Sequence, residues 1–233
     1  MTNATKEDLM ELYEARGDEA AFREALPLFE AAVANAPNPE DLRHYGYLLE
    51  CHGRRWLRQA ATQYERAIEL DPSVDKVRYQ LISARAGLQE LEQEVDVYEK
   101  RLAAAPDDIR EYRFLACAYL AAGAYDKARE VAERGLSLAP SDAILIYDRG
   151  EARSKTGDPD GALADWRLAL TLDTEDIGPL YMSAFLLERE GRIPEAIDAW
   201  QSILDWSQTR DNKLDMEWPT RELERLRGGS PKG

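Results

Sequence analysis

The sequence predicts an all-α fold made of repeated helical hairpins, and two features of its 233 residues carry this prediction. The first is a spacing of 34 or 35 residues between successive prolines, at Pro37, Pro72, Pro106 and Pro140. The second is that three further sets of residues recur in register with these prolines. Repeats of this length are typical of solenoids, in which each unit buries its apolar face only by packing against its neighbours.

Two of these sets predict the faces along which helices pack. A small residue recurs at Ala25, Ala60, Ala128, Ala162 and Ala196, with Glu94 in the same column. Four residues later stand Phe29, Tyr64, Tyr98, Ala132, Trp166 and Trp200. Because residues four apart share one face of a helix, the alanine permits close approach of a second helix and the larger side chain fills the space beside it.

The remaining positions predict where the helices end. Glycine recurs at Gly123, Gly157 and Gly191, and it permits the left-handed backbone that ends the first helix of a hairpin. The prolines end the second helix, because the residue before a proline is pushed out of the α region. The residues after three of the prolines, Ser73, Asp107 and Ser141, are expected to cap the next helix.

Six repeats follow in order, and they form a solenoid over residues 1–207. Their approximate bounds are 5–38, 39–73, 74–107, 108–141, 142–175 and 176–207. The first two carry short insertions before the alanine. The third is irregular, with Gln89 for glycine, Glu94 for alanine and Arg101 where other repeats have alanine. That repeat either packs loosely, or bends the array, or exposes a more polar surface, and we favour the last alternative.

The chain from 208 to 227 is expected to form a linker and a capping helix, and residues 228–233 a flexible tail. Pro219 suits the first turn of a helix, and Leu223 and Leu226 can cover the apolar end of the array. A terminal helix with a polar outer face keeps a solenoid soluble.

These features resemble the tetratricopeptide repeat family. The best matches are "FLACAYLAAGAYDKAREVAERGLSLAP" (114–140), "DRGEARSKTGDPDGALADWRLALTLD" (148–173) and "FLLEREGRIPEAIDAWQSIL" (185–204). The resemblance runs from about Leu9 to Ser207. It implies a right-handed α-solenoid of about six hairpins, and says little about biological role, because function is grafted onto such a scaffold.

Composition narrows the classes of partner. The formal net charge is −15, with 45 acidic and 30 basic residues, so neither nucleic acid nor an anionic membrane surface is expected to bind. No apolar run approaches the roughly 20 residues that span a bilayer, and the N-terminal residues lack a secretory leader. Two cysteines without framework spacing favour a reducing, cytoplasmic location.

No group of residues predicts catalysis, a metal or a cofactor. His44 and Cys51 are seven residues apart, which on one helix separates them by about 10 Å, too far to share an ion. His52 points away from its neighbour Cys51. We therefore expect a non-catalytic protein.

The resemblance implies a concave groove lined by the first helix of each hairpin. The residues in the groove register are Arg43, Lys76, Tyr79, Arg110, Arg113, Tyr147, Tyr181 and Phe185. Arginine and tyrosine dominate binding hot spots, so we expect an adaptor that holds a segment of a partner protein, acidic segments among them. The competing interpretation is that the tyrosines pack between hairpins and the arginines pair with local carboxylates.

A second class of function is self-assembly into a homo-oligomer through the ends of the array. The apolar residues that suggest it are Leu9 and Leu12 at one end, and Trp206 and Trp218 at the other.

Overall fold

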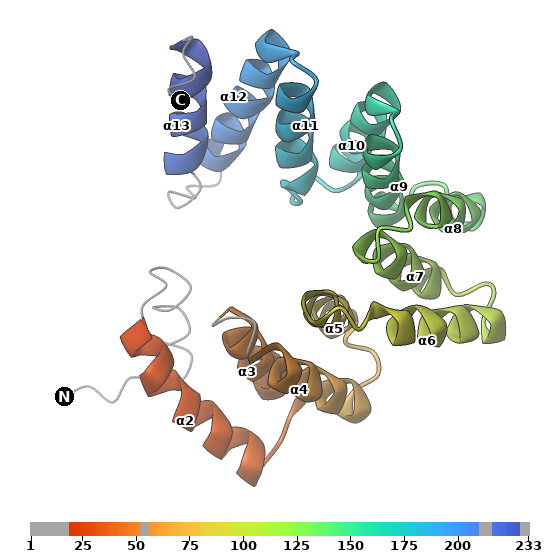
Figure 1. Ribbon diagram of the computed structural model, residues 1–233, viewed down its shortest axis with the longest axis vertical. Helices are drawn as coiled ribbons and strands as arrows, with labels where there is room; N and C mark the ends of the chain where they lie inside the picture. The colour runs from red at the N-terminus through yellow and green to blue at the C-terminus, as the bar shows by residue number, and fades with distance from the viewer. Residues whose placement is uncertain (1–18, 52–55, 210–215, 229–233) are drawn as a thin grey trace. The chain divides into compact units, whose positions relative to one another are not determined.

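The computed structural model describes residues 19–51, 56–209 and 216–228, and these residues form helices without any strand (Figure 1). In chain order the helices are α2 (Glu19–Asn35), α3 (Pro39–Cys51), α4 (Leu57–Leu70), α5 (Asp75–Leu88), α6 (Leu91–Ala104), α7 (Ile109–Ala121), α8 (Tyr125–Leu138), α9 (Ala143–Lys155), α10 (Pro159–Leu172), α11 (Gly178–Arg189), α12 (Ile193–Thr209) and α13 (Glu217–Arg227). The odd-numbered helices from α3 to α11 are the first helices of five hairpins. Leu9 and Leu12 lie outside the described residues.

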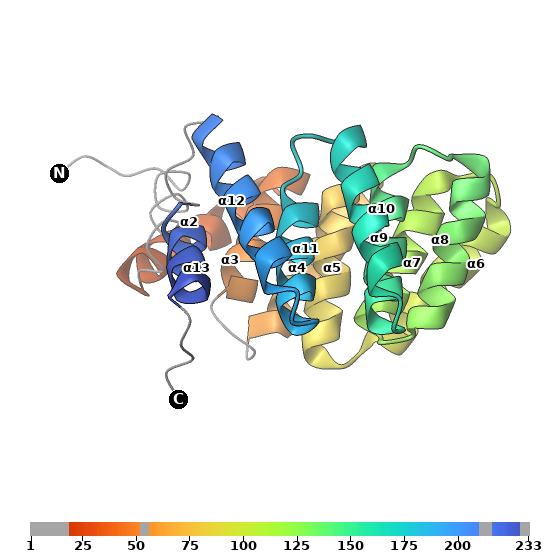
Figure 2. The same ribbon diagram turned by 90° about the horizontal axis from the view of Figure 1, so that it is seen from above.

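The chain divides into two compact units, residues 1–100 and 101–233, and the division falls within α6. In the first unit, α2 packs against α3, α3 against α4, and α4 against α5. In the second unit the same holds from α7 to α13 (Figure 2). The fold is therefore the all-α solenoid of helical hairpins that the repeat predicts.

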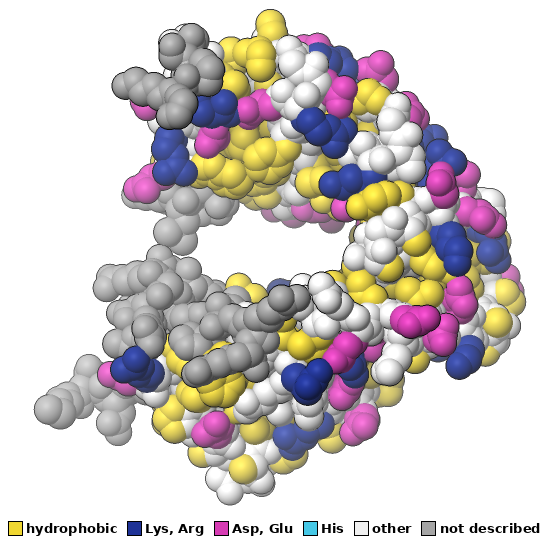
Figure 3. Space-filling model, in the orientation of Figure 1, with side chains coloured by type: hydrophobic (Ala, Val, Ile, Leu, Met, Phe, Trp, Pro, Cys, Tyr) yellow, Lys and Arg dark blue, Asp and Glu magenta, His cyan; other side chains and the backbone are white. Residues whose placement is uncertain are grey.

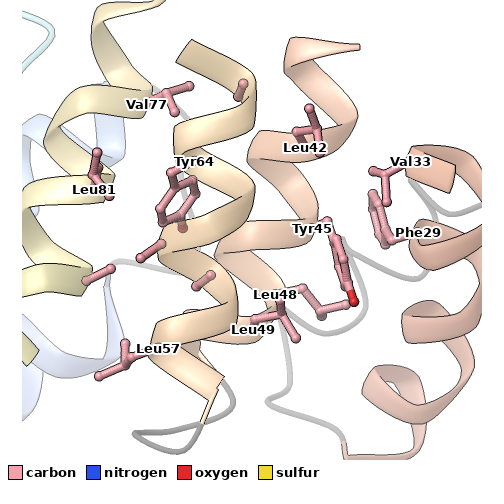
Figure 4. Packing of buried hydrophobic residues seen from close by; sticks show 14 of the residues in the cluster. Phe29, Val33, Leu42, Tyr45, Leu48, Leu49, Leu57, Tyr64, Val77 and Leu81 are labelled. Carbon is pink, nitrogen blue, oxygen red and sulfur yellow. The ribbon is translucent and has the colours of Figure 1, made fainter. Parts of the chain in front are cut away.

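The recurring small and large residues form the core. Each of the five alanines in the small column is fully buried. Tyr64 lies on α4 within the cluster of buried residues that Figure 4 shows. Trp166 and Trp200 are likewise buried in the second unit. A methyl group added to Gly46 would collide with the ring of Tyr64, and one added to Gly150 with the ring of Trp166. The aromatic column thus packs directly against the backbone of the preceding helix.

The predicted helix ends are confirmed where the structure describes them. Gly123, Gly157 and Gly191 have φ of 73°, 88° and 71°, the left-handed conformation that ends a helix. Gln89, which replaces glycine in the third repeat, has a φ of 63° and takes the same conformation. The turn is therefore preserved, although a side chain is less favourable there than glycine.

The predicted caps are wrong by one residue. Asp108 caps α7 and Asp142 caps α9, accepting from the backbone N–H of Arg110 and Leu145, while Val74 precedes α5 without a side-chain cap. The reason is a turn that follows each second helix, in which the N–H of Asp108 donates to the carbonyl of Ala105 at 3.1 Å. Pro106 and Asp107 are its central residues, so the helix starts one residue later than a cap directly after proline would allow.

The irregular third repeat keeps its buried column. Glu94 is buried where other repeats have alanine, and Tyr98, four residues later, is buried as well. The outer side of α6 is polar, with Glu92, Asp96 and Glu99 exposed, as we favoured from the sequence.

The C-terminal helix covers the end of the second unit. Leu223 is buried against Trp200 and Ile203, with Leu226 beside it, and Pro219 lies in the first turn of α13. Leu223 and Leu226 thus lie against the apolar residues at the end of the second unit.

Candidate partner-binding faces

Two surfaces carry the predicted site residues, and we call each the first-helix face of its unit. In the first unit this face is formed by α3 and α5, which lie side by side, and in the second by α7, α9 and α11. The first carries Arg43, Lys76 and Tyr79; the second carries Arg110, Arg113, Tyr147, Tyr181 and Phe185.

The first-helix face of the first unit contains an open hollow. It has a volume of about 420 Å³ and is lined by Tyr47, Glu50, Lys76, Tyr79, Gln80 and Ser83. The structure thus brings Lys76 and Tyr79 together, as the repeat register predicts. Lys76 is exposed, so its ammonium group is available to a partner. The hollow offers one cation and two tyrosine rings to whatever occupies it.

Polar groups at the base of this hollow were not predicted. The carboxylate of Glu50 accepts hydrogen bonds from the hydroxyls of Tyr64 and Ser83, both at 2.8 Å, which fixes its position. The Oε1 atom of Gln80 is buried and has no hydrogen-bond partner among the described residues. The register that placed Arg43 also leads to Tyr47, since Tyr47 follows Arg43 by four residues as Ser83 follows Tyr79.

Arg43 lines a second hollow, of about 410 Å³, in the same unit. Its other lining residues are Asn38, Pro39, Glu40, Asp71 and Val74. The guanidinium of Arg43 donates to the ring nitrogen of the adjacent His44. The structure therefore does not place Arg43 in the hollow that holds Lys76 and Tyr79.

The two arginines of the second unit are paired with carboxylates of their own chain. Arg110 contacts Asp108 through Nη2 and Oδ2 at 2.9 Å, and the hydrogen bond from Arg110 lowers the pKa of that carboxyl. Arg113 donates from Nε and Nη2 to Oδ2 of Asp142, at 2.9 and 2.5 Å. Because Asp142 is buried and also caps α9, this pair ties α7 to the start of α9. For these two residues the structure shows the pairing that the competing interpretation expected.

Tyr147 is half-buried against the next helix of its hairpin. Its ring lies 6.4 Å from that of Trp166, and its carbonyl accepts from the indole N–H of Trp166 at 3.2 Å. Burial raises the pKa of the Tyr147 hydroxyl, and Glu151 and Asp148 raise it further. The side chain is therefore neutral at physiological pH and contributes to packing between α9 and α10.

A buried acidic group lies beside Tyr147. Asp148 is almost fully buried, and its Oδ2 atom has no hydrogen-bond partner among the described residues. Burial raises the pKa of Asp148, as does the negative charge of Glu151 and Asp142, while Arg113 opposes the shift. Burial also raises the pKa of the nearby Cys117 thiol, so this thiol stays protonated and is a poor nucleophile.

Tyr181 and Phe185 lie under the C-terminal helix. The ring of Trp218, on α13, stacks on Tyr181 at 5.4 Å with an interplanar angle of 15°, and lies 5.6 Å from the ring of Phe185. The sequence assigned Trp218 to self-association; the structure places it on two of the predicted site residues. Figure 3 shows hydrophobic side chains gathered over α11 and α12, with charged side chains around them.

Neither a metal site nor a membrane-spanning helix is found in the described part of the chain. No three His, Cys, Asp or Glu side chains among residues 19–51, 56–209 and 216–228 are grouped so that they could hold a metal ion. None of the helices in these ranges is long and apolar enough to cross a membrane. His52 lies outside the described residues.

Solved structures share this fold. A thermophilic TPR protein from Thermus thermophilus matches with a TM-score of 0.61 and 21% identity, over 81% of this chain and 98% of that chain. A tetratricopeptide repeat protein from Parabacteroides merdae matches with a TM-score of 0.53 and 16% identity, over 97% and 94%. Yeast Tom70 matches with a TM-score of 0.63 and 15% identity, over 96% of this chain but 46% of its own.

No curated protein matches the chain in sequence. Residues 115–178 match the family model described as tetratricopeptide repeat. They comprise most of the α7–α8 hairpin and the whole of the α9–α10 hairpin, the region where the glycine, alanine and proline columns are most regular. The repeat columns, the hairpin fold and this match agree: residues 115–178 match tetratricopeptide repeats, and the chain has the fold of tetratricopeptide repeat proteins.

Proposed function

We propose that the chain is a non-catalytic scaffold that holds a segment of a partner protein on its first-helix faces. The tetratricopeptide repeat fold supports a protein–protein interaction scaffold in general. The observation that carries the finer proposal is the hollow between α3 and α5, because it is open and is lined by Lys76 and two tyrosines. Tyrosine is among the residue types that dominate interface hot spots.

Lys76 indicates the charge that we expect on the partner. An ammonium group at the rim of an otherwise acidic protein attracts a carboxylate, so the segment carries Asp or Glu where it meets α5. The net charge of −15 disfavours nucleic acid as the partner. The proposal places the protein in the cytoplasm, where its two cysteines would remain reduced.

The test compares two lysines of the first unit. Lys76→Glu with Tyr79→Ala changes the hollow, whereas Lys100→Glu makes the same charge change at an exposed position on α6. Each purified variant is used to capture proteins from source-cell lysate, and binding of each captured protein is then measured by calorimetry with both components purified. We expect the double variant to lose the partner and Lys100→Glu to keep it.

Equal binding by both variants and the unaltered protein would show that this hollow is not the site. Arg113 and Tyr147 are poor first targets, because the contacts of Arg113 with Asp142 and of Tyr147 with Trp166 would confound loss of binding with loss of packing.

The second candidate function is self-association through the C-terminal end. Phe185 and Trp218 are 43% and 41% exposed, which leaves apolar surface at that end. Trp206 contributes less to such a contact, since its indole N–H donates to the carbonyl of Thr174 at 2.9 Å. Light scattering at two concentrations separates the candidates, because an assembly that forms through this surface grows with concentration and a monomeric scaffold does not.

A further inference from the structure

Four aromatic rings meet where α11, α12 and α13 come together. Trp200, on α12, is fully buried and forms the base of the cluster. The rings of Tyr181 and Phe185, on α11, lie 5.9 and 5.4 Å from it, both edge to face. Trp218 lies over all three, at 5.4 Å from Tyr181 and 5.6 Å from the other two rings. These separations are within the range of favourable aromatic pairs.

Trp218 covers this base and remains partly exposed. The anchor of α13 is Leu223, which is buried against Trp200 and Ile203. The indole N–H of Trp218 donates to Glu222 of the same helix at 3.1 Å, so it does not bond to the face below. Trp218 is 41% exposed, and its ring stacks on that of Tyr181.

A charged contact accompanies the ring. Arg225, seven residues after Trp218, pairs with Glu188 at the end of α11. The other oxygen of Glu188 accepts from the indole N–H of Trp200 at 2.7 Å, which holds the carboxylate in place. The surface therefore combines an aromatic base with a fixed acidic group about two helical turns away.

The repeat register relates this surface to the hollow in the first unit. Tyr181 and Phe185 stand 102 residues, three repeats, after Tyr79 and Ser83, both of which line that hollow. In the second unit no further first helix follows α11, and α13 presents Trp218 to these positions instead.

We propose that Tyr181, Phe185 and Glu188 form a subsite for a partner helix that carries an aromatic residue and, seven residues later, an arginine or lysine. This inference rests on the proposed scaffold function and names one of its ligands. In the isolated chain α13 occupies the subsite with its own Trp218 and Arg225, and a partner helix of the same pattern competes with it. The chemistry of the ligand follows from this internal occupant, since Trp218 stacks on Tyr181 and Arg225 pairs with Glu188.

The test uses the full chain and a synthetic peptide of residues 216–228, MEWPTRELERLRG, labelled for fluorescence anisotropy. The chain variant Trp218→Ala with Arg225→Ala removes the two side chains with which α13 fills the subsite, so that α13 keeps only its Leu223 anchor and the peptide displaces it more easily. We expect it to bind the peptide at least about tenfold more tightly than the unaltered chain, since two contacts of the order of 1 kcal/mol become available. If α13 leaves the surface entirely in this variant, the subsite is still open, so the test keeps its meaning.

Matched controls separate this subsite from unspecific binding. Peptides with alanine in place of the tryptophan, or in place of the second arginine, should each lose about tenfold in affinity. Adding Phe185→Ala to the double variant should remove the gain, whereas Trp218→Phe alone should behave like the unaltered chain. Equal affinity of the double variant and the unaltered chain, or equal binding of the alanine peptides, would overturn the proposal.

The two proposals fail in different ways. If the peptide does not distinguish the variants while Lys76→Glu with Tyr79→Ala still loses the partner, the subsite is wrong and the scaffold function stands. If the peptide behaves as expected while the Lys76 variant keeps every partner, the subsite stands and the α3–α5 hollow is not the partner site.

Discussion

The first-helix faces of the two units carry residues of the same repeat positions in different states. Lys76 is exposed and lines an open hollow, whereas Arg110, one repeat later, is paired with Asp108. Tyr79 lines that hollow as well, whereas Tyr147, two repeats later, packs on Trp166. The same repeat positions therefore line an open hollow in the first unit, and are paired or packed within the chain in the second.

The largest effect is expected from the residue beneath the second face. Trp166→Ala should reduce the free energy of unfolding by about 3–5 kcal/mol, because it removes a fully buried ring and the support of Tyr147. Urea unfolding followed by circular dichroism measures the change. Trp218→Ala is the matched control, since that ring is 41% exposed, and it should cost far less. Equal losses for the two variants would mean that Trp166 is not an anchor of the second unit.

The next largest effect on the free energy of unfolding is expected at Arg113, which is paired, and not at Lys76, which is exposed. Arg113→Met should cost about 1–3 kcal/mol, because it leaves the buried carboxylate of Asp142 without its partner, although the N–H of Leu145 still donates to that carboxylate. Lys76→Met changes an exposed side chain and should stay within about 0.5 kcal/mol. Urea midpoints of the two variants make the comparison. A stability loss at Lys76 as large as that at Arg113 would remove the distinction between the faces.

The columns of small and aromatic residues were enough to predict the hairpins and the core. The residues of these columns lie where one helix packs on the next helix in the sequence. Because the repeat length is nearly constant, the same positions can be identified in every pair of helices. Glu94 takes the alanine position in the third repeat and is buried like the alanines, so the column holds even where the residue type changes.

Whether each site residue is exposed, paired or packed could not be predicted from these columns. The pairing of Arg113 depends on Asp142 pointing back from the start of α9, and the sequence placed that cap one residue too early. The cover over Tyr181 and Phe185 depends on where α13 docks, and Trp218 is 33 residues from Phe185 along the chain. Both are contacts outside the repeat period, so the columns contain no signal for them.

The smallest effect tests the buried acid of the second face. Burial, with Glu151 and Asp142, raises the pKa of Asp148 in the folded chain, whereas the unfolded chain titrates near 3.9. The folded state therefore holds this proton more tightly than the unfolded state, so its contribution to stability is complete below pH 4 and is lost as the pH rises through the folded pKa. Asp148→Asn cannot ionise and should escape this loss.

We accordingly expect Asp148→Asn to be more stable than the unaltered chain at pH 7, by about 1 kcal/mol, and equal to it near pH 4. Urea midpoints measured from pH 4 to pH 8 give the dependence, with the exposed Asp96→Asn as the control that should show no such gap. Arg113 on α7 is the one charge named above that opposes the shift, so Arg113→Met should widen the difference between Asp148 and Asn at neutral pH. A gap that stays constant with pH would mean that Asp148 is ionised in the folded chain, and that the second face carries a negative charge next to the Arg113–Asp142 pair rather than a neutral buried carboxyl group.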